Sequence, residues 1–229
     1  MAERTLSHYA AFRFAEAFWQ LAPTARRRAL SSLLTDLTDT ADRVALYQRY
    51  PAGDDADLVV WSALDGDDPA AADGFFRRTG AAVARHRPLL VPGATLWGLT
   101  RPSPYVREAS KSALDPLAAE RLPYLIVYPF VKTHAWYRLE LDERRRLMGE
   151  HIRVGRRYDG VRQLLLYAFG LQDQDFVVVY DTADLALFSE LVGELRATEA
   201  RAYTARDTPV WTAVHRRVDE LLELWAPEA

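Results

Sequence analysis

Short runs that alternate apolar and polar residues predict strands in the first hundred residues, and longer runs with apolar residues every three or four positions predict helices. Thr24 is expected to be the N-cap of a helix that ends near Leu37, and Pro69 suits the first turn of a second helix. The expected elements are strand 9–19, helix 24–37, strand 43–50, strand 57–64, helix 68–85 and strand 89–99. This order is that of a ferredoxin-like unit.

The same order of elements is expected a second time, beyond a connector over residues 101–122 that is rich in Pro, Ser, Arg and Ala. The later elements are strand 123–132, helix 142–156, strand 161–169, strand 175–182, helix 183–197 and strand 208–215. A last amphipathic helix is expected after residue 214, because five apolar residues share one face at helical spacing: Val214, Val218, Leu221, Leu222 and Trp225.

The two units are also related residue by residue, at a constant offset of 118 positions. Phe12 matches Phe130, and the arginine triplet 26–28 matches the triplet 144–146. Further along, the strand that begins at Asp57 matches the one that begins at Asp175 without a gap. An offset that holds over about fifty positions indicates an internal duplication. We therefore expect an α+β protein in which an N-terminal ferredoxin-like repeat (1–100) and a C-terminal one (123–229) pair their sheets into a dimeric α/β-barrel-type core.

Three differences between the copies point to a functional site in the second. His151 corresponds to Leu33, Tyr128 to Ala10 and Lys132 to Phe14. A fold does not need these three side chains, because the first copy forms without them. The C-terminal repeat is therefore expected to carry the site and the N-terminal repeat to be a scaffold. Drift between the two halves is the alternative for each position taken singly.

Composition narrows the class of protein. Apolar residues make up 49% of the 229 residues and charged residues 27%, as in an ordinary globular protein. The net charge of -3 argues against a nucleic-acid binder. The chain has no cysteine, which excludes disulfides, thiol catalysis and thiolate metal sites. No secretory signal and no apolar run long enough for a membrane span are visible, so a cytoplasmic protein is expected.

The chemistry open to His151 depends on its neighbours along the chain. A lone histidine on an apolar helix face is more often a hydrogen-bonded core residue than a ligand, and the chain has no second histidine at the spacing of a zinc site. One histidine is enough for haem, where the porphyrin supplies four nitrogens and the protein one axial bond. Lys132 and Arg121 could pair with haem propionates, and Tyr128 beside such a metal could be oxidised to a radical.

The motifs of the second repeat resemble those of the chlorite dismutase-like superfamily, and most of all its coproheme decarboxylase branch. The resemblance rests on YPFVK, WYRL, ERRRLMGEHIRVGRRY and the stretch from YAFGLQDQDF to TPVW, and it spans at least residues 120–215. It implies two ferredoxin-like repeats and assembly as a homopentamer.

The same resemblance assigns roles to individual residues. His151 corresponds to the proximal ligand of the haem iron, Tyr128 to the radical tyrosine and Lys132 to a propionate contact. Gln163 corresponds to the distal residue, where chlorite-degrading members carry arginine, although counting forward from His151 leaves Leu164 as an alternative. Porphyrin contacts are also implied for the residues between Tyr128 and Lys132 and for one residue before them: Pro129, Phe130, Val131 and Arg121.

The implied activity is the oxidative decarboxylation of two propionates of iron coproporphyrin III (coproheme) to give haem b. Coproheme would be both substrate and redox centre, and hydrogen peroxide the oxidant. Two other functions stay open: a chlorite dismutase or general haem peroxidase of the same family, and a haem carrier or haemless structural or regulatory oligomer.

Overall fold

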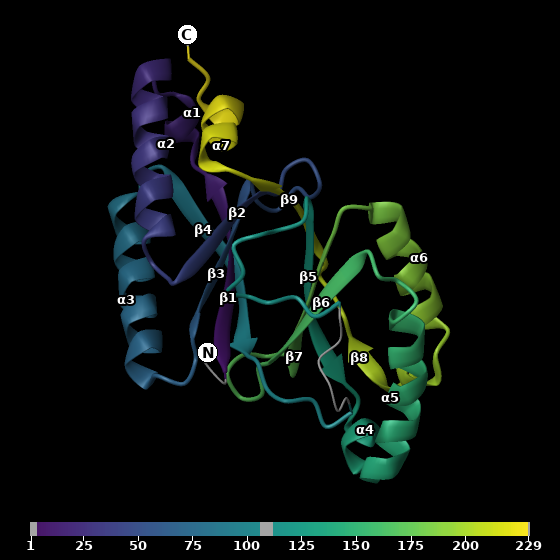
Figure 1. The fold of residues 1–229 in the computed structure, drawn as a ribbon. Helices are drawn as coiled ribbons and strands as arrows, with labels where there is room; N and C mark the ends of the chain where they lie inside the picture. The colour runs from purple at the N-terminus through teal and green to yellow at the C-terminus, as the bar shows by residue number, and fades with distance from the viewer. Residues whose placement is uncertain (1–3, 106–111, 229) are drawn as a thin grey trace.

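The computed structural model describes residues 4–105 and 112–228, and it contains two units with the same order of elements (Figure 1). The elements of the first repeat are β1 (Thr5–Phe14), α1 (Glu16–Trp19), α2 (Pro23–Thr38), β2 (Arg43–Gln48), β3 (Leu58–Asp65), α3 (Pro69–Arg85) and β4 (Leu90–Leu99). The second repeat comprises β5 (Tyr124–Lys132), α4 (His134–Arg138), α5 (Leu141–Gly155), β6 (Val161–Tyr167), β7 (Phe176–Thr182), α6 (Leu185–Arg196), the 3₁₀ helix η1 (Glu199–Tyr203), β8 (Thr204–Arg206), β9 (Trp211–Arg216) and α7 (Val218–Trp225).

The strands of the two repeats close into one antiparallel ring. Within each repeat the first strand lies between the fourth and the third, as β4-β1-β3-β2 and as β9-β5-β7-β6. The repeats join where β2 pairs with β9 and where β4 meets β6 at Leu99 and Tyr167. Because β5 also pairs with β7, the order runs round the ring and returns to its start, with β8 added beside β5. The predicted α+β fold with two ferredoxin-like repeats is thus confirmed.

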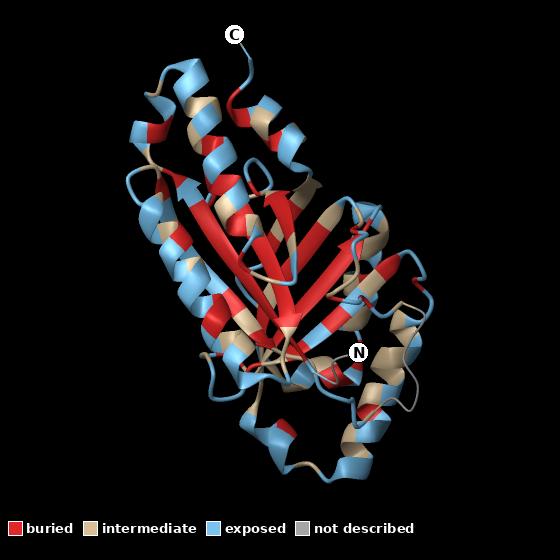
Figure 2. Cartoon of the chain, turned by 60° about the vertical axis from the view of Figure 1, so that its left-hand side comes forward, coloured by how far each residue is buried: buried red, intermediate tan, exposed pale blue. Residues whose placement is uncertain are grey.

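Strand alternation gives the ring an inner and an outer face. The inner face holds a cluster of buried apolar residues that includes Tyr9, Tyr47, Trp61, Leu125 and Trp211. Helices cover the outer face, with α2, α3 and α7 on one side of the barrel and α5 and α6 on the other (Figures 1 and 2). Among the described residues, no helix is long and apolar enough to cross a membrane.

Both repeats hold the end of their first strand in the same way. A side-chain oxygen of Asp57 accepts a hydrogen bond from the backbone N–H of Phe14 at 2.7 Å. At the matching positions, Asp175 accepts from the N–H of Lys132 at 2.8 Å. The same kind of hydrogen bond therefore fixes the backbone at residues 14 and 132, and only the side chains differ.

The C-terminal helix α7 packs on the outer face of the first repeat. Leu221 and Trp225 belong to the same buried cluster as Phe14 and Leu33, and the ring centroids of Phe14 and Trp225 are 4.9 Å apart. Arg27 on α2 donates a hydrogen bond to the backbone oxygen of Ala226 and thereby fixes the end of α7. The face that matches the candidate site of the second repeat is thus filled with apolar side chains of the chain's own C-terminus.

Some local predictions were wrong. The first strand is β1, and α1 occupies residues that had been predicted to continue it. Helix α2 begins at Pro23 with Ala22 at its N-cap, because proline at the first helical position needs no donor partner, so Thr24 lies inside the helix. Val214 is part of β9, and α7 starts only at Val218. Neither η1 nor β8 was predicted.

Closure at the β4–β6 seam depends on a glycine. A Cβ added to Gly98 would lie 2.7 Å from the backbone oxygen of Tyr167, which cannot move without breaking the seam. We expect Gly98→Ala to lower the free energy of unfolding by about 1–3 kcal/mol, the usual range for an overpacked site. The matched control is Gly80→Ala on α3, where a Cβ meets nothing within 4 Å. That variant should gain about 0.5–1 kcal/mol from helix propensity. Urea denaturation of both variants measures the difference, and equal stabilities would contradict the role of Gly98.

Candidate active site

The structure brings Tyr128, Lys132 and His151 to the same side of the second repeat. Tyr128 and Lys132 lie on β5 and project from the outer face of the barrel toward α5 and α6, and His151 projects from α5. Lys132 is near enough to His151 for its charge to lower the pKa of the imidazole. The three residues that distinguish the second repeat from the first therefore lie on one face of that repeat, along β5 and the facing helix α5, and we refer to this set as a cluster.

Tyr128 is packed in an apolar and aromatic layer between the sheet and the helices. Its neighbours in that layer include Tyr180 on β7 and Val154 on α5. The Tyr128 and Tyr180 rings are stacked with their centroids 6.3 Å apart, and their hydroxyls are hydrogen-bonded. Burial, followed by the neighbouring Tyr180, raises the pKa of Tyr128 well above its ordinary value. The side chain is thus a neutral phenol held in a fixed orientation.

Lys132 is a half-buried cation at the end of β5. Its Nζ donates to the backbone oxygen of Ala200 at 3.2 Å and lies over the Trp136 ring, 4.3 Å from the centroid. Burial and then the charge of Arg201 lower the pKa of Lys132 to about 8. Within residues 4–105 and 112–228, no carboxylate lies within ion-pair distance of this ammonium group. Lys132 can therefore pair with a carboxylate supplied by a ligand.

His151 is a neutral imidazole on the inner face of α5. Leu147, one turn earlier, is buried, while Met148 and His151 are half-buried. Burial, followed by the charge of Lys132, lowers the pKa of His151 to about 4. A neutral imidazole has a nitrogen lone pair free to ligate a metal.

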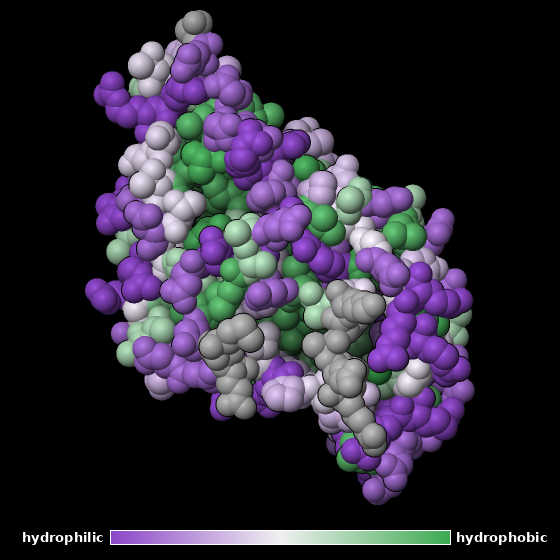
Figure 3. All heavy atoms as spheres, viewed as in Figure 1, coloured by the Kyte–Doolittle hydropathy of each residue, from purple (hydrophilic) through white to green (hydrophobic). Residues whose placement is uncertain are grey.

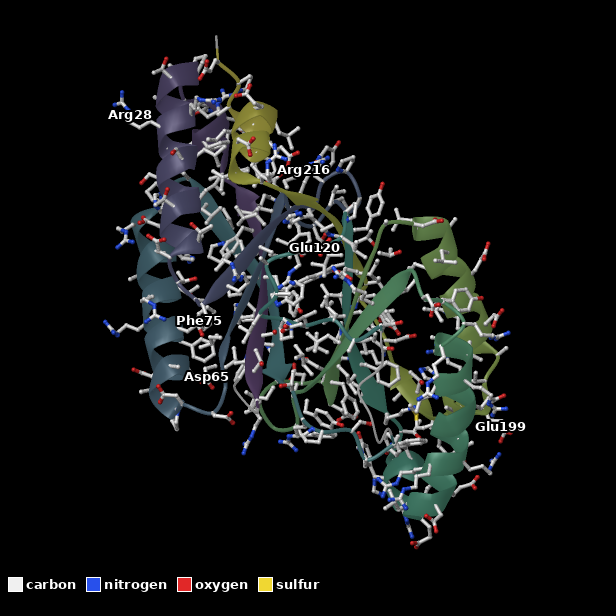
Figure 4. All side chains as sticks on the ribbon, viewed as in Figure 1. Arg28, Asp65, Phe75, Glu120, Glu199 and Arg216 are labelled. Atoms are coloured by element: carbon white, nitrogen blue, oxygen red, sulfur yellow. The ribbon has the colours of Figure 1, made fainter. Side chains whose placement is uncertain are left out.

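Glu199, the first residue of η1, pairs with an arginine and not with His151. Its carboxylate binds Arg146 at 2.8 Å, and Figure 4 shows it at the outer edge beside α5. The acidic side chain whose charge acts on His151 is Glu150, which raises the imidazole pKa against the larger effect of burial.

The register of β6 decides between Gln163 and Leu164. Gln163 lies directly opposite Tyr180 in the β6–β7 pair, so its side chain shares the outer face with Tyr128. That side chain is exposed. Leu164 points into the barrel and belongs to the inner apolar cluster. Only Gln163 can contact a ligand that also contacts Tyr128.

Arg121 lies apart from this cluster. Its guanidinium enters the barrel, lies 4.1 Å from the centroid of the Trp61 ring and donates hydrogen bonds to backbone carbonyl groups. The expectation that it holds a propionate together with Lys132 is therefore corrected, because the sheet separates the two side chains.

The segment between Tyr128 and Lys132 also divides between the two faces. By strand alternation Phe130 shares the face of Tyr128, and it packs against the same cluster. Pro129 and Val131 alternate to the other face of β5, where Pro129 is buried. The structure thus offers Phe130 as a side-chain contact and the other two only through their backbone.

Two residues of the cluster were not predicted. Tyr180 corresponds to Ser62 at the offset of 118, so a systematic comparison of the repeats would have found it as a fourth difference. Trp136 matches Phe18 at the same offset. In the first repeat Phe14 and Phe18 stack at 4.2 Å, whereas in the second Lys132 lies over Trp136 at 4.3 Å. The substitution of Phe14 by Lys132 thus changes an aromatic stack into a cation–π contact.

The side chains of this cluster suit one kind of metal centre. Among the described residues no group of three or more His, Asp or Glu side chains could hold a bare metal ion. One neutral histidine, an unpaired ammonium group and an aromatic layer suit an iron porphyrin, which brings four nitrogens of its own and carries carboxylates. Figure 3 shows that hydrophilic residues dominate the outer side of α5 and α6, so the apolar positions lie toward the sheet.

The chain is similar to known proteins over most of its length. A coproheme decarboxylase from Mycolicibacterium smegmatis is 33% identical over 171 residues, which cover 73% of this chain and 71% of that protein. Two structures of chlorite dismutase from Candidatus Nitrospira defluvii, a double mutant and a complex with imidazole, match with TM-scores of 0.84 and 0.81 at 22% and 21% identity. Each match covers 97% of this chain and 95% of the other, and at that identity it shows a shared fold alone. The family model described as chlorite dismutase matches residues 22–216, and the chain therefore belongs to the chlorite dismutase family.

Proposed function

We propose that the protein is a peroxide-dependent coproheme decarboxylase, which converts two propionates of iron coproporphyrin III to vinyl groups and so makes haem b. The observation that carries the proposal is the pair formed by Tyr128 and Lys132. A buried phenol and a cation without a carboxylate partner share one face with a neutral histidine. A haem carrier needs neither the phenol nor its hydrogen bond to Tyr180. The 33% identity to a protein named coproheme decarboxylase supports the same function.

Each residue of the cluster has a role in binding. His151 would bind the iron through its free ring nitrogen, and Lys132 would pair with a propionate carboxylate. Phe130 offers an apolar surface to the macrocycle, and Gln163 places an amide on the same face of the sheet without adding charge. Tyr180 holds the phenol of Tyr128 in one orientation through the hydrogen bond between their hydroxyls.

The chemistry of each propionate balances with one peroxide. The bound iron porphyrin supplies the oxidising equivalents that it gains from hydrogen peroxide. Tyr128 gives up its phenolic hydrogen as a proton and an electron, and the resulting radical takes a hydrogen atom from the β-carbon of the propionate. Loss of carbon dioxide and of one further electron leaves the vinyl group. The two electrons that each propionate gives up in this way reduce one molecule of hydrogen peroxide to two water molecules. Hydrogen abstraction needs near contact, which explains why the phenol must be fixed.

The proposal extends to a homopentamer that acts in the cytoplasm, as the resemblance to the coproheme decarboxylases implies. Light scattering of the purified chain measures its mass in solution, and a monomer would contradict this part of the proposal without affecting the chemistry.

The direct test mixes the purified protein with ferric coproporphyrin III and hydrogen peroxide. The product mass should fall in two steps, each by one carbon dioxide and two hydrogen atoms. Unchanged coproheme would contradict the proposed function. Rapid, sustained release of oxygen from chlorite would instead favour a chlorite dismutase.

The radical role of Tyr128 predicts the behaviour of Tyr128→Phe. This change removes one hydroxyl and keeps the ring, so porphyrin binding should persist while decarboxylation slows by at least a hundredfold. The matched control is Tyr124→Phe on the same strand and face, about 13 Å away. It should retain wild-type activity. Mass spectrometry of the product measures both variants, and comparable rates for the two would rule out the radical route through Tyr128.

Iron ligation predicts the behaviour of His151→Ala. The variant loses the protein's bond to iron, so coproheme should bind at least tenfold more weakly and its Soret band should shift. His134→Ala, at the exposed start of α4, is the control and should bind as the wild type does. An unchanged spectrum of His151→Ala would make His151 a structural residue.

The lowered pKa of Lys132 predicts a pH dependence of binding. A carboxylate ligand binds the protonated ammonium group, so affinity is greatest below pH 8 and falls as pH rises through the value of about 8. The loss should reach at least about tenfold, because a hydrogen bond to a charged group contributes about 1.5–3 kcal/mol. Lys132→Gln should bind weakly with no such fall, and Lys132→Arg should keep its affinity above pH 8. Fluorescence quenching by coproheme, titrated from pH 6 to 10, measures all three proteins, and parallel profiles would contradict the role of Lys132.

A further inference from the structure

One end of the barrel interior contains polar side chains that the proposed function does not use. The connector crosses this end: Leu114 joins the inner apolar cluster, and the backbone N–H of Leu122 donates to Asp181 at 3.3 Å. Figure 4 shows Glu120 of the connector over the barrel, far from Glu199 beside α5. We call this region the connector end and define it by the side chains that point into it: Tyr9, Tyr47, Arg121, Arg162, Asp181 and His215.

Arg121 brings a positive charge into the connector end. Its guanidinium donates to the backbone oxygens of Asp115, Pro116 and Glu120 at 3.2, 2.6 and 3.1 Å. Its Nε is buried and has no hydrogen-bond partner among the described residues. In the same part of the chain no carboxylate lies within ion-pair distance of Arg121, so only carbonyl dipoles and the Trp61 ring face its charge.

Two tyrosine hydroxyls are buried in the same region. The side chains of Tyr9 and Tyr47 have no measurable exposure, and neither hydroxyl meets a hydrogen-bond partner in good geometry among the described residues. The nearby Ser7 hydroxyl accepts from the Trp61 indole at 3.3 Å and lies close enough to Tyr9 to act on its pKa. Burial raises the pKa of both phenols, and Arg121 opposes that rise in each. Tyr9 and Arg121 both face the Trp61 ring, with 5.3 Å between the Tyr9 and Trp61 centroids and 4.1 Å from the guanidinium to the Trp61 centroid.

The charges of the connector end do not cancel. Arg162 and Asp181 form a two-bond ion pair, with nitrogen–oxygen distances of 2.7 and 2.5 Å, and neutralise each other. His215 lies 5.4 Å from Tyr47 between ring centroids, and burial, followed by Arg121, lowers its pKa, so it is neutral at pH 7. Among the described residues Arg121 is left without an ion-pair partner, while the exposed carboxylate of Glu120 acts on Arg162 from the connector.

We propose that the connector end binds a small monovalent anion, of the size of chloride or bicarbonate, through the hydroxyls of Tyr47 and Tyr9 and the Nε of Arg121. All three open positions can donate, and a buried donor without a partner is unfavourable. A water molecule could donate to the phenol oxygens and accept from the Nε, but it would leave the charge of Arg121 unbalanced. An anion satisfies the donors and balances the charge together. It would also fix the connector, which carries Arg121, to the barrel.

The test uses the whole chain without porphyrin, so its outcome does not depend on the proposed function. Protein dialysed into sodium gluconate is titrated with sodium chloride at constant ionic strength, and thermal unfolding is followed. Binding to the folded state should raise Tm by about 4 °C, and above Kd the rise should follow the logarithm of the chloride concentration. Separate titrations with sodium bicarbonate and sodium nitrate identify the preferred anion. A Tm that is the same in every salt would overturn the proposal.

Tyr47→Phe separates a bound anion from an empty or merely hydrated cavity. If the hydroxyl binds an anion, the variant should be less stable than the wild type in chloride and should lose most of the chloride-dependent rise in Tm. If the hydroxyl has no partner at all, Tyr47→Phe should instead be more stable than the wild type, because the substitution removes an unfavourable buried group. The control is Tyr137→Phe, whose hydroxyl donates to Asp175 outside the barrel at 2.7 Å. It should lose stability and keep the full chloride response. A Tyr47→Phe variant that keeps that response, or equals the wild type in stability, would overturn the proposal.

Discussion

The strands of both repeats pair edge to edge until β6 meets β4 and β9 meets β2, so each strand of the ring has a neighbour on both sides. Closure of this kind satisfies backbone hydrogen bonds and removes sheet edges that could pair with other chains. It also forces alternate side chains to opposite faces, with no freedom to slip by one residue. Alternate positions along a strand therefore face either the barrel core or the outer face that carries the site. Leu164 lies inside the barrel and Gln163 lies outside.

The shared scaffold leaves the second repeat free to exchange side chains at fixed positions. Asp57 and Asp175 anchor the ends of β1 and β5 in the same way, so Phe14 and Lys132 project from equivalent backbone. The first repeat uses that position for an aromatic stack, and the second uses it for a half-buried cation. A charge in such a place is tolerated because the Trp136 ring and the Ala200 carbonyl oxygen face it. The aromatic layer that stabilises the outer face thus also sets the properties of the candidate site.

Much of this architecture could be predicted from sequence, because the duplication allows the two repeats to be compared position by position. The constant offset located the second copy of almost every element, and the exchanges at residues 128, 132 and 151 marked the face that the structure assembles. Arg121 could not be placed in this way, because it lies in the connector, which has no counterpart in the first repeat. Tyr180 was not predicted as a site residue because a tyrosine in an apolar strand is usually a core residue. The start of α7 was misplaced because Val214 fits both the helical period and the alternation of β9.

The C-terminal helix α7 affects how many clefts between sheet and helices remain open to a ligand in each chain. A duplicated fold has approximate twofold symmetry, and such symmetry alone would give each chain two equivalent clefts between sheet and helices. By packing Leu221 and Trp225 against Phe14 and Leu33, α7 acts as a permanent internal occupant of one of them. If the proposed site binds the porphyrin, the chain is functionally asymmetric, with one binding equivalent per chain, and its two halves can diverge under different constraints.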